Sequence, residues 1–166
     1  MKMIIHDLSE EDYRRVFPTD PENCKIVGDD GTFHQCIGCL GCWFRTPGEC
    51  PMKDRFSRIA KDLSATDELV LISRCLYGSV SPFIKNALDR MIGYLVPGIE
   101  LRDQETHFKV RYPGRLRISV HFYGDLGEED KKTAYDYLEI LSKSLEASAA
   151  AVEFHSSVDE LKETVL

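Results

Sequence analysis

Several features are absent from this sequence, and each absence argues against a class of protein. No apolar run approaches the length of a membrane span, so we expect a protein that does not cross a bilayer. Basic residues are outnumbered, 21 against 28 acidic ones, and the net charge of -7 argues against general nucleic-acid binding. A Gly-x-Gly-x-x-Gly fingerprint and a Ser-His-Asp arrangement are also missing. The histidines at 6, 34, 121 and 155 are scattered, and we expect structural roles for them.

The chain also lacks internal repeats and low-complexity linkers. Its 166 residues, 43% hydrophobic and 30% charged, suit a soluble globular protein, and we predict a single domain over 1–166. The beginning, Met1–Leu8, is too short and turns acidic too soon for a secretory signal, so we expect a cytoplasmic protein. In the cytoplasm its six cysteines stay reduced, as ligands, reactive thiols or packing residues rather than disulfides.

Apolar strand-like runs alternate with helical patterns along the chain. This alternation predicts an α/β fold in which helices cover a parallel sheet. The run Glu68–Ser73 is apolar throughout its interior, as expected of a central strand that is buried on both faces. Strands are predicted over Met3–Ile5, Cys24–Val27, Leu69–Ile72, Leu116–Phe122 and Ala149–Phe154.

The helix signals are equally regular. Ser81 is a good N-cap residue and Pro82 suits the first helical position. Helices are predicted from Ser81 to Gly93, just after Lys53, from Glu128 to Ser148 and from Val158 to Leu166. The segment Tyr94–Gly114 is too long for an ordinary connection, so we expect a lid, a subunit contact or a small hairpin there.

Four cysteines lie within a short segment in the pattern Cys-x2-Cys-x2-Cys-x7-Cys, at Cys36, Cys39, Cys42 and Cys50. Glycines at 38 and 41 give the backbone the freedom to wrap around a soft metal centre. Three hypotheses stay open for these thiols: a 4Fe-4S cluster, a zinc ion, or free thiols. We expect Trp43 to anchor this loop to the body of the protein or to a neighbouring subunit. Cys24 and Cys75 are expected to be small core residues.

The turn Ser73–Ser81 follows the predicted central strand and leads into the Ser81 helix. Ligands of open parallel sheets bind beyond the carboxyl ends of the strands, so this turn lies at the expected crevice. Gly78 permits a close backbone approach, and Tyr77 offers a flat surface against which a planar ring could stack.

These motifs together resemble a known family. The cysteine run, its continuation Thr46-Pro47-Gly48-x-Cys50, and the Ser73–Ser81 turn that leads into Lys85–Arg90 are similar to the flavodoxin-like NAD(P)H-dependent FMN reductases. The similarity is greatest to the cysteine-bearing branch that includes the iron-sulfur flavoproteins. It implies a three-layer doubly wound five-stranded parallel sheet of order 2-1-3-4-5, bound FMN, and homodimers or homotetramers. It also implies hydride transfer from NADH or NADPH to the flavin.

The resemblance assigns flavin-binding roles to two loops of this chain. The residues concerned are Ser73, Arg74, Cys75, Leu76, Tyr77 and Gly78 in the first loop, and Tyr123, Gly124 and Asp125 in the second. Two positions depart from the family pattern, which usually has proline at position 74 and tyrosine at position 76.

A larger departure concerns the loop that holds the FMN phosphate in the family. That loop is rich in serine, threonine and asparagine, whereas this chain has Asp7-Leu8-Ser9-Glu10-Glu11-Asp12. Four carboxylates would repel a phosphate. Basic residues that could offset them are Arg74, His107, Lys109 and Arg111, although the last three also suit a solvated hairpin face.

We therefore predict an FMN-dependent NAD(P)H oxidoreductase that passes reducing equivalents to a small acceptor, with cofactor chemistry rather than a catalytic side chain. Two alternatives remain. The first is an iron-sulfur flavoprotein electron carrier with a 4Fe-4S cluster on the cysteine loop. The second is a cofactor-free scaffold with the flavodoxin fold, in which the same loop makes subunit contacts or binds zinc.

Overall fold

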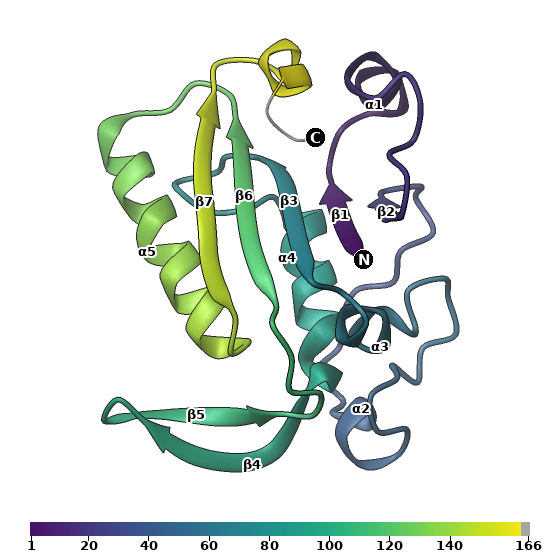
Figure 1. Cartoon of the computed structure of the whole chain (residues 1–166). Helices are drawn as coiled ribbons and strands as arrows, with labels where there is room; N and C mark the ends of the chain where they lie inside the picture. Colours follow the sequence, from purple (N-terminus) through teal and green to yellow (C-terminus); the bar gives the residue numbers. More distant parts are fainter. Residues whose placement is uncertain (164–166) are drawn as a thin grey trace.

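Five parallel strands form the central sheet of the computed structural model, which describes residues 1–163 (Figure 1). The strands follow the order β2-β1-β3-β6-β7, which is the predicted order 2-1-3-4-5 when only the strands of this sheet are counted. Their bounds are Lys2–His6 for β1, Cys24–Gly28 for β2, Glu68–Arg74 for β3, Arg117–Tyr123 for β6 and Ser148–His155 for β7. The predicted flavodoxin-like α/β fold is confirmed.

Helices connect these strands and cover both faces of the sheet. The α-helices are α1 (Glu10–Val16), α2 (Gly41–Phe44), α3 (Ile59–Ser64), α4 (Pro82–Arg90) and α5 (Glu128–Ser144). Two 3-10 helices, η1 (Met91–Tyr94) and η2 (Val158–Glu163), complete the set. Residues 164–166 of the predicted closing helix lie outside the described part of the chain.

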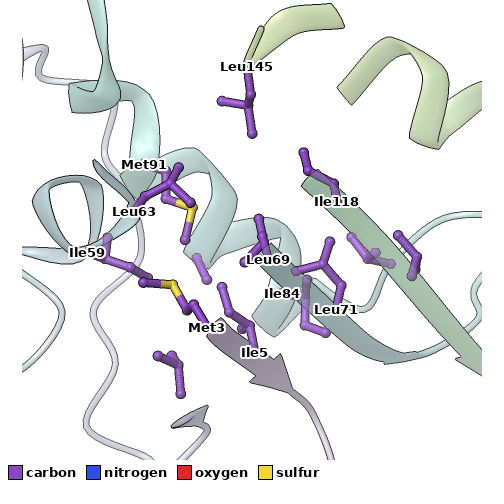
Figure 2. Packing of buried hydrophobic residues seen from close by; sticks show 14 of the residues in the cluster. Met3, Ile5, Ile59, Leu63, Leu69, Leu71, Ile84, Met91, Ile118 and Leu145 are labelled. Atoms are coloured by element: carbon purple, nitrogen blue, oxygen red, sulfur yellow. The ribbon is translucent and has the colours of Figure 1, made fainter. Parts of the chain in front are cut away.

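The main core lies between one face of the sheet and the helices α3, α4 and α5 (Figure 2). Each strand sends alternate side chains to this face, because successive residues of a strand point to opposite sides. Met3, Leu69 and Ile118 occupy neighbouring register positions there and are fully buried. Ile84 from α4 and Leu63 from α3 close over them.

The opposite face of the sheet has a smaller core. Ile4, Val70 and Ile72 pack there against Tyr13 of α1 and Leu161 of η2. Toward β6 and β7 this face becomes polar, since Ser119 and His121 are buried on it. The second face is therefore apolar near β1 and β3 and polar near β7.

The segment 94–114 forms a hairpin, one of the three forms expected for it. Strand β4 (Leu95–Arg102) pairs with β5 (Glu105–Val110) in antiparallel fashion. Figure 1 shows this hairpin at the amino edge, the edge of the sheet where the five parallel strands begin. The opposite edge, where they end, is called the carboxyl edge below.

Three helix boundaries differ from the prediction. Helix α5 ends at Ser144 rather than Ser148, because Glu146 turns the chain with a φ of 53° and Ser148 already pairs with Arg117 in the sheet. The α-helical part of α4 ends at Arg90, and the 3-10 helix η1 continues past the predicted stop at Gly93. The helix expected just after Lys53 begins only at Ile59.

Two short helices, α1 and α2, were not predicted.

Within the described residues, no helix is both long and apolar enough to cross a membrane.

Candidate functional site

The two predicted flavin loops lie side by side at the carboxyl edge. Arg74 and Tyr123 are register partners at the ends of β3 and β6, so the loops that follow them start together. The Cys75 amide donates to the Tyr123 carbonyl at 3.1 Å and holds the loops against each other. The fold thus brings the predicted residues 73–78 and 123–125 to one place.

The first loop contains a tight two-residue turn. The amide of Leu76 donates to the Ser79 carbonyl and the amide of Ser79 donates back, both at 2.9 Å. The central residues Tyr77 and Gly78 have φ values of 54° and 76°, which a two-residue turn of this kind requires at both positions. A Cβ atom at Gly78 would lie 2.4 Å from Thr133 Cβ, so only glycine lets this turn pack against α5.

The side chain of Tyr77 extends from this turn into solvent. It is 92% exposed, although tyrosine rings usually bury much of their surface. Ser73, in contrast, is fully buried, and its hydroxyl accepts from the Ser81 amide at 2.8 Å while donating to the Arg74 carbonyl. Ser73 therefore shapes the loop, and Tyr77 is its most exposed large hydrophobic side chain.

The second loop borders a hollow of about 430 Å³ at the carboxyl edge. Gly124 and Asp125 line it together with Phe154 and Glu160. Gly124 has a φ of 120°, and nothing lies within 4 Å of the position a Cβ would take. Its amide donates to the His155 carbonyl at 3.0 Å. The backbone of this loop is fixed to β7, and its outer side is open.

The third loop of the carboxyl edge connects β1 to α1, and its first side chain is hydrogen-bonded to the neighbouring strands. The Asp7 carboxylate accepts from the Arg74 amide and from the Tyr123 hydroxyl, both at 3.0 Å, and so joins the ends of three strands. Burial and the nearby Asp7 raise the pKa of Tyr123, which keeps that hydroxyl protonated as a donor.

The start of α1 is capped by the chain itself and is acidic. Ser9 caps the helix by accepting from the Asp12 amide at 3.1 Å, and Glu10, Glu11 and Asp12 fill the first turn. These carboxylates already interact with the positive end of the helix dipole, where a phosphate would otherwise bind. The residues present here do not fit a bound phosphate group.

The basic residues considered as a replacement do not reach this loop. His107 and Lys109 belong to β5 in the hairpin at the amino edge, and Arg111 follows it (Figure 1). Arg111 donates to the Gly93 carbonyl at 3.0 Å, and His107 faces Glu105 at 3.5 Å. The proposal that these three residues hold the phosphate is wrong, because the parallel strands separate them from it. Arg74 alone remains beside the loop.

A cavity of about 510 Å³ lies under the cysteine loop, the segment 36–50. All four predicted ligands, Cys36, Cys39, Cys42 and Cys50, line it. The remaining wall is mostly apolar and comes from η1 and the carboxyl-terminal halves of α4 and α5, with Leu88, Met91, Ile92, Tyr137, Leu141 and Leu145. Its volume falls within the range of small-molecule sites in proteins.

A buried ion pair and two further contacts hold the cysteine loop on α4 and η1. The Arg90 guanidinium is fully buried and forms a bidentate pair with Asp54, one of whose contacts is 2.8 Å. Although burial alone would raise it, the Arg90 charge keeps the pKa of Asp54 low. The Cys36 amide donates to Asn86 Oδ1 at 2.8 Å. Trp43 Nε1 donates to the Ile92 carbonyl at 2.7 Å, which confirms its predicted role as an anchor.

The four thiols differ in environment. Cys39 is exposed, Cys36 and Cys50 are half-buried, and Cys42 is buried. Burial, followed by the neighbouring thiols, raises the pKa of Cys42. Within residues 1–163, no three of these sulfur atoms lie within 4.8 Å of one another, so they do not form a single-ion zinc site in this arrangement.

A group of ligand-type side chains that sequence reasoning missed lies on β6 and β7. His121, Glu153 and His155 place one nitrogen or oxygen atom each within 4.8 Å of the others. The sequence leaves these histidines scattered, 34 positions apart, and the parallel pairing of β6 with β7 brings them together. The Glu-x-His spacing at 153–155 puts both side chains on one face of a strand, and this was the available signal.

No family model matches this sequence, and no curated protein matches it significantly. Solved structures do match in fold. General stress protein 14 from Treponema denticola, in complex with FMN, has a TM-score of 0.58 at 14% identity, over 97% of this chain and 91% of that one. An FMN-dependent NADH-azoreductase from Bacillus anthracis, in complex with FMN, has a TM-score of 0.54 at 11% identity, over 98% and 92%.

An NADPH-quinone reductase from P. pentosaceus gives a TM-score of 0.52 at 12% identity, over 93% of this chain and 83% of that one. Identities this low establish the fold alone. The chain is thus similar to flavodoxin-like reductases in architecture, and its function has to be argued from its own residues.

Proposed function

We propose that this chain works as one flavodoxin-like domain that binds the ring system of a flavin at the carboxyl edge and acts as an NAD(P)H-dependent oxidoreductase on a small acceptor. The observation that supports it most is the pairing of the two loops at 73–78 and 123–125, joined by the hydrogen bond from Cys75 to Tyr123. Gly124 has a positive φ and nothing within 4 Å of its Cβ position, so its backbone is open to a flat ligand, whereas Gly78 packs the first loop against α5. Solved proteins with this fold include ones in complex with FMN.

The role of each residue follows from its position. A bound flavin would accept a hydride from the nicotinamide and pass electrons on to the acceptor. Tyr77 is free to stack on a planar ring, because its side chain is 92% exposed and is not engaged in the core. Asp7 fixes the ends of β1, β3 and β6, and with them the loops that receive the ring.

The phosphate of FMN is not held as in the family that the sequence resembles. Asp7 is engaged with the protein, and the first turn of α1 is acidic. Each carboxylate near a phosphate costs about 1 kcal/mol at contact distance even in water. This chain should therefore select for the ring and not for the phosphate.

Fluorescence titration of the purified protein with FMN and with riboflavin tests this proposal. We expect quenching with both ligands, and riboflavin should bind at least as tightly as FMN. Replacing Glu10 and Glu11 by glutamine should strengthen FMN binding and leave riboflavin unchanged. If neither flavin binds to the folded protein, the alternative of a cofactor-free scaffold is supported instead.

Oxidation of NADH and NADPH with a quinone or azo acceptor then tests turnover. We expect flavin-dependent oxidation of at least one nicotinamide. Size-exclusion chromatography with light scattering measures the mass of the assembly. We propose a homodimer or homotetramer, as the resemblance to the FMN reductases implies. A flavin-loaded protein that oxidises neither nicotinamide would contradict the reductase activity while leaving flavin binding intact.

A second candidate, a flavoprotein electron carrier with a 4Fe-4S cluster, is favoured by one observation. All four cysteines of the loop line the same cavity although they come from separate turns. A cluster separates its thiolates more widely than a single ion does, so the present spacing does not argue against it. Anaerobic purification followed by iron and sulfide analysis tests this candidate. A brown protein that loses its colour in Cys39→Ser would support it, and an iron-free protein would contradict it.

A further inference from the structure

Three side chains with metal-binding atoms converge between β6 and β7. His121 Nδ1 lies 3.3 Å from His155 Nε2 and 3.4 Å from a Glu153 carboxylate oxygen. His155 Nε2 lies 3.9 Å from the same oxygen. Glu153 is the register partner of His121, and His155 follows two positions later on the same face of β7.

These separations match the edges of a small coordination polyhedron. A tetrahedral zinc ion with bonds of about 2.0 to 2.1 Å has ligand atoms about 3.3 to 3.4 Å apart. Two of the three separations, at 3.3 and 3.4 Å, have this length, and the third, between His155 Nε2 and Glu153, is longer at 3.9 Å.

The surroundings suit a metal ion as well. The two imidazoles are buried, with 4% and 6% of His121 and His155 exposed, so the sheet fixes their positions. The Glu153 side chain is 38% exposed and gives a path from solvent. Imidazole binds metals in its neutral form, and burial of both rings favours that form over the charged one.

We propose that His121, Glu153 and His155 form a binding site for one divalent transition metal ion, with zinc as the preferred ion. Two imidazoles and one carboxylate are a common zinc ligand set, and three protein ligands leave one position for water or another small ligand. The ion would also tie the edge strand β7 to its neighbour β6. The site adjoins the second flavin loop, because His155 lines the same hollow as Gly124 and its carbonyl accepts from the Gly124 amide. Its three ligands are not among the proposed flavin-binding residues, so the two proposals are tested separately.

Thiolates have a high affinity for zinc even outside a formed site, so the test uses a protein in which Cys36, Cys39 and Cys50 are replaced by serine. These three thiols are exposed or half-buried, whereas Cys42 is buried and remains. Calorimetric titration of this variant with zinc chloride at neutral pH should give one site per chain. The melting temperature should rise with zinc, because an ion that binds only the folded state stabilises it.

The proposed metal ligands are tested by adding Glu153→Gln or His155→Gln to the variant that lacks the three cysteines. Each should weaken zinc binding at least about tenfold, because the loss of even an outer partner of a metal ligand costs that much. The matched control is His107→Gln, which removes a histidine beside a glutamate in the hairpin and should leave binding unchanged.

Cobalt gives a second, spectroscopic criterion. Cobalt bound to nitrogen and oxygen ligands should show visible d–d bands without the near-ultraviolet charge-transfer band of a thiolate complex. Circular dichroism and apo-protein melting show whether each variant is folded, and Glu153→Gln alters a partly exposed side chain that should not disturb folding.

The proposal is overturned if the folded background protein binds no zinc, or if binding persists in both Glu153→Gln and His155→Gln. It is also overturned if the cobalt spectrum shows thiolate ligation in the cysteine variant. None of these results bears on flavin binding, which is measured separately by fluorescence.

Discussion

The two candidate regions of this molecule, the carboxyl-edge loops and the cysteine-loop cavity, use their residues in opposite ways. At the carboxyl edge, Asp7 accepts hydrogen bonds from Arg74 and Tyr123 and joins the ends of three strands, so the protein's own groups occupy this place. At the cysteine loop, a buried ion pair and Trp43 attach the loop to α4 and η1, and a cavity of about 510 Å³ remains beneath it. The fold therefore gives the expected position of a ligand site, but local side chains decide where space remains for a ligand.

The largest expected effect comes from breaking the ion pair that supports the cysteine loop. Arg90→Met should reduce the free energy of unfolding by about 3 to 5 kcal/mol, because it leaves Asp54 buried without its partner. Urea unfolding measures the change. Arg55→Met is the matched control, since the Arg55–Asp30 pair is partly exposed and should cost less than about 1 kcal/mol. Equal losses in the two variants would show that the buried pair does not hold the cavity.

The carboxyl edge should respond to pH through His6, at the end of β1. Its ring stacks on Tyr13 at 4.5 Å and packs against Gly28, and burial lowers the pKa of His6 to about 4. Below pH 6.5 the unfolded chain takes up a proton that the folded chain does not. Stability is therefore fully present above pH 6.5 and is lost as the pH falls to about 4, by about 3 kcal/mol.

Unfolding of the parent and of His6→Phe at pH 7 and pH 4.5 checks this prediction. The parent should lose about 2 to 3 kcal/mol more than the variant over this interval. An identical pH dependence in both proteins would mean that His6 is protonated within the fold.

Two glycine substitutions should destabilise the protein by different amounts, because the two flavin loops are packed differently. Gly78→Ala should cost about 2 kcal/mol or more, because it adds the strain of a positive φ to a contact of 2.6 Å with the Asp130 carbonyl oxygen. Gly124→Ala should cost about 1 kcal/mol, since it has the strain but no neighbour within 4 Å. Thermal unfolding of both variants measures the difference. Equal costs would indicate that the 76–79 turn is not packed on α5.

The smallest effect on stability is expected from Tyr77→Ala. The side chain is 92% exposed, so the free energy of unfolding should change by less than about 0.5 kcal/mol. Flavin affinity should fall several-fold if the ring stacks there, as aromatic stacking contributes about 0.5 to 1.5 kcal/mol. The matched control is Tyr135→Ala on α5, whose side chain is 55% exposed and packs edge-on against Phe154. Unchanged flavin affinity in Tyr77→Ala would show that the flavin ring does not stack on this turn.

Much of the fold could be predicted from local patterns. The five strands followed from apolar runs, and the position of Ser73–Ser81 followed from its place after the continuously apolar strand β3. Helix α1 was missed because its seven residues, with Tyr13 and Val16 as the buried pair, give too short a periodic pattern. Helix α2 was missed because glycines and cysteines dominate its segment and suggest a loop.

The site was only partly predictable, for reasons of long-range geometry. The acidic sequence after β1 indicated that phosphate would not fit, but the Asp7–Tyr123 hydrogen bond spans 116 positions and leaves no local signal. His107 and Lys109 stayed open between offsetting the acidic loop and a hairpin face, because sequence does not show to which end of a sheet a long connection folds; they lie on the hairpin. His121 and His155 meet only through the pairing of β6 and β7.

Trp43 has a practical consequence for all of these experiments. It is the single tryptophan of the chain, and it touches both the Ile92 carbonyl and the ring of Phe108, whose centroid lies 5.1 Å away. Its emission is therefore an intrinsic optical signal for the junction between the cysteine loop and the hairpin. Alkylation or metallation of the thiols should shift that emission, whereas zinc at His121 should leave it unchanged, so an unlabelled sample can report which region a ligand has reached.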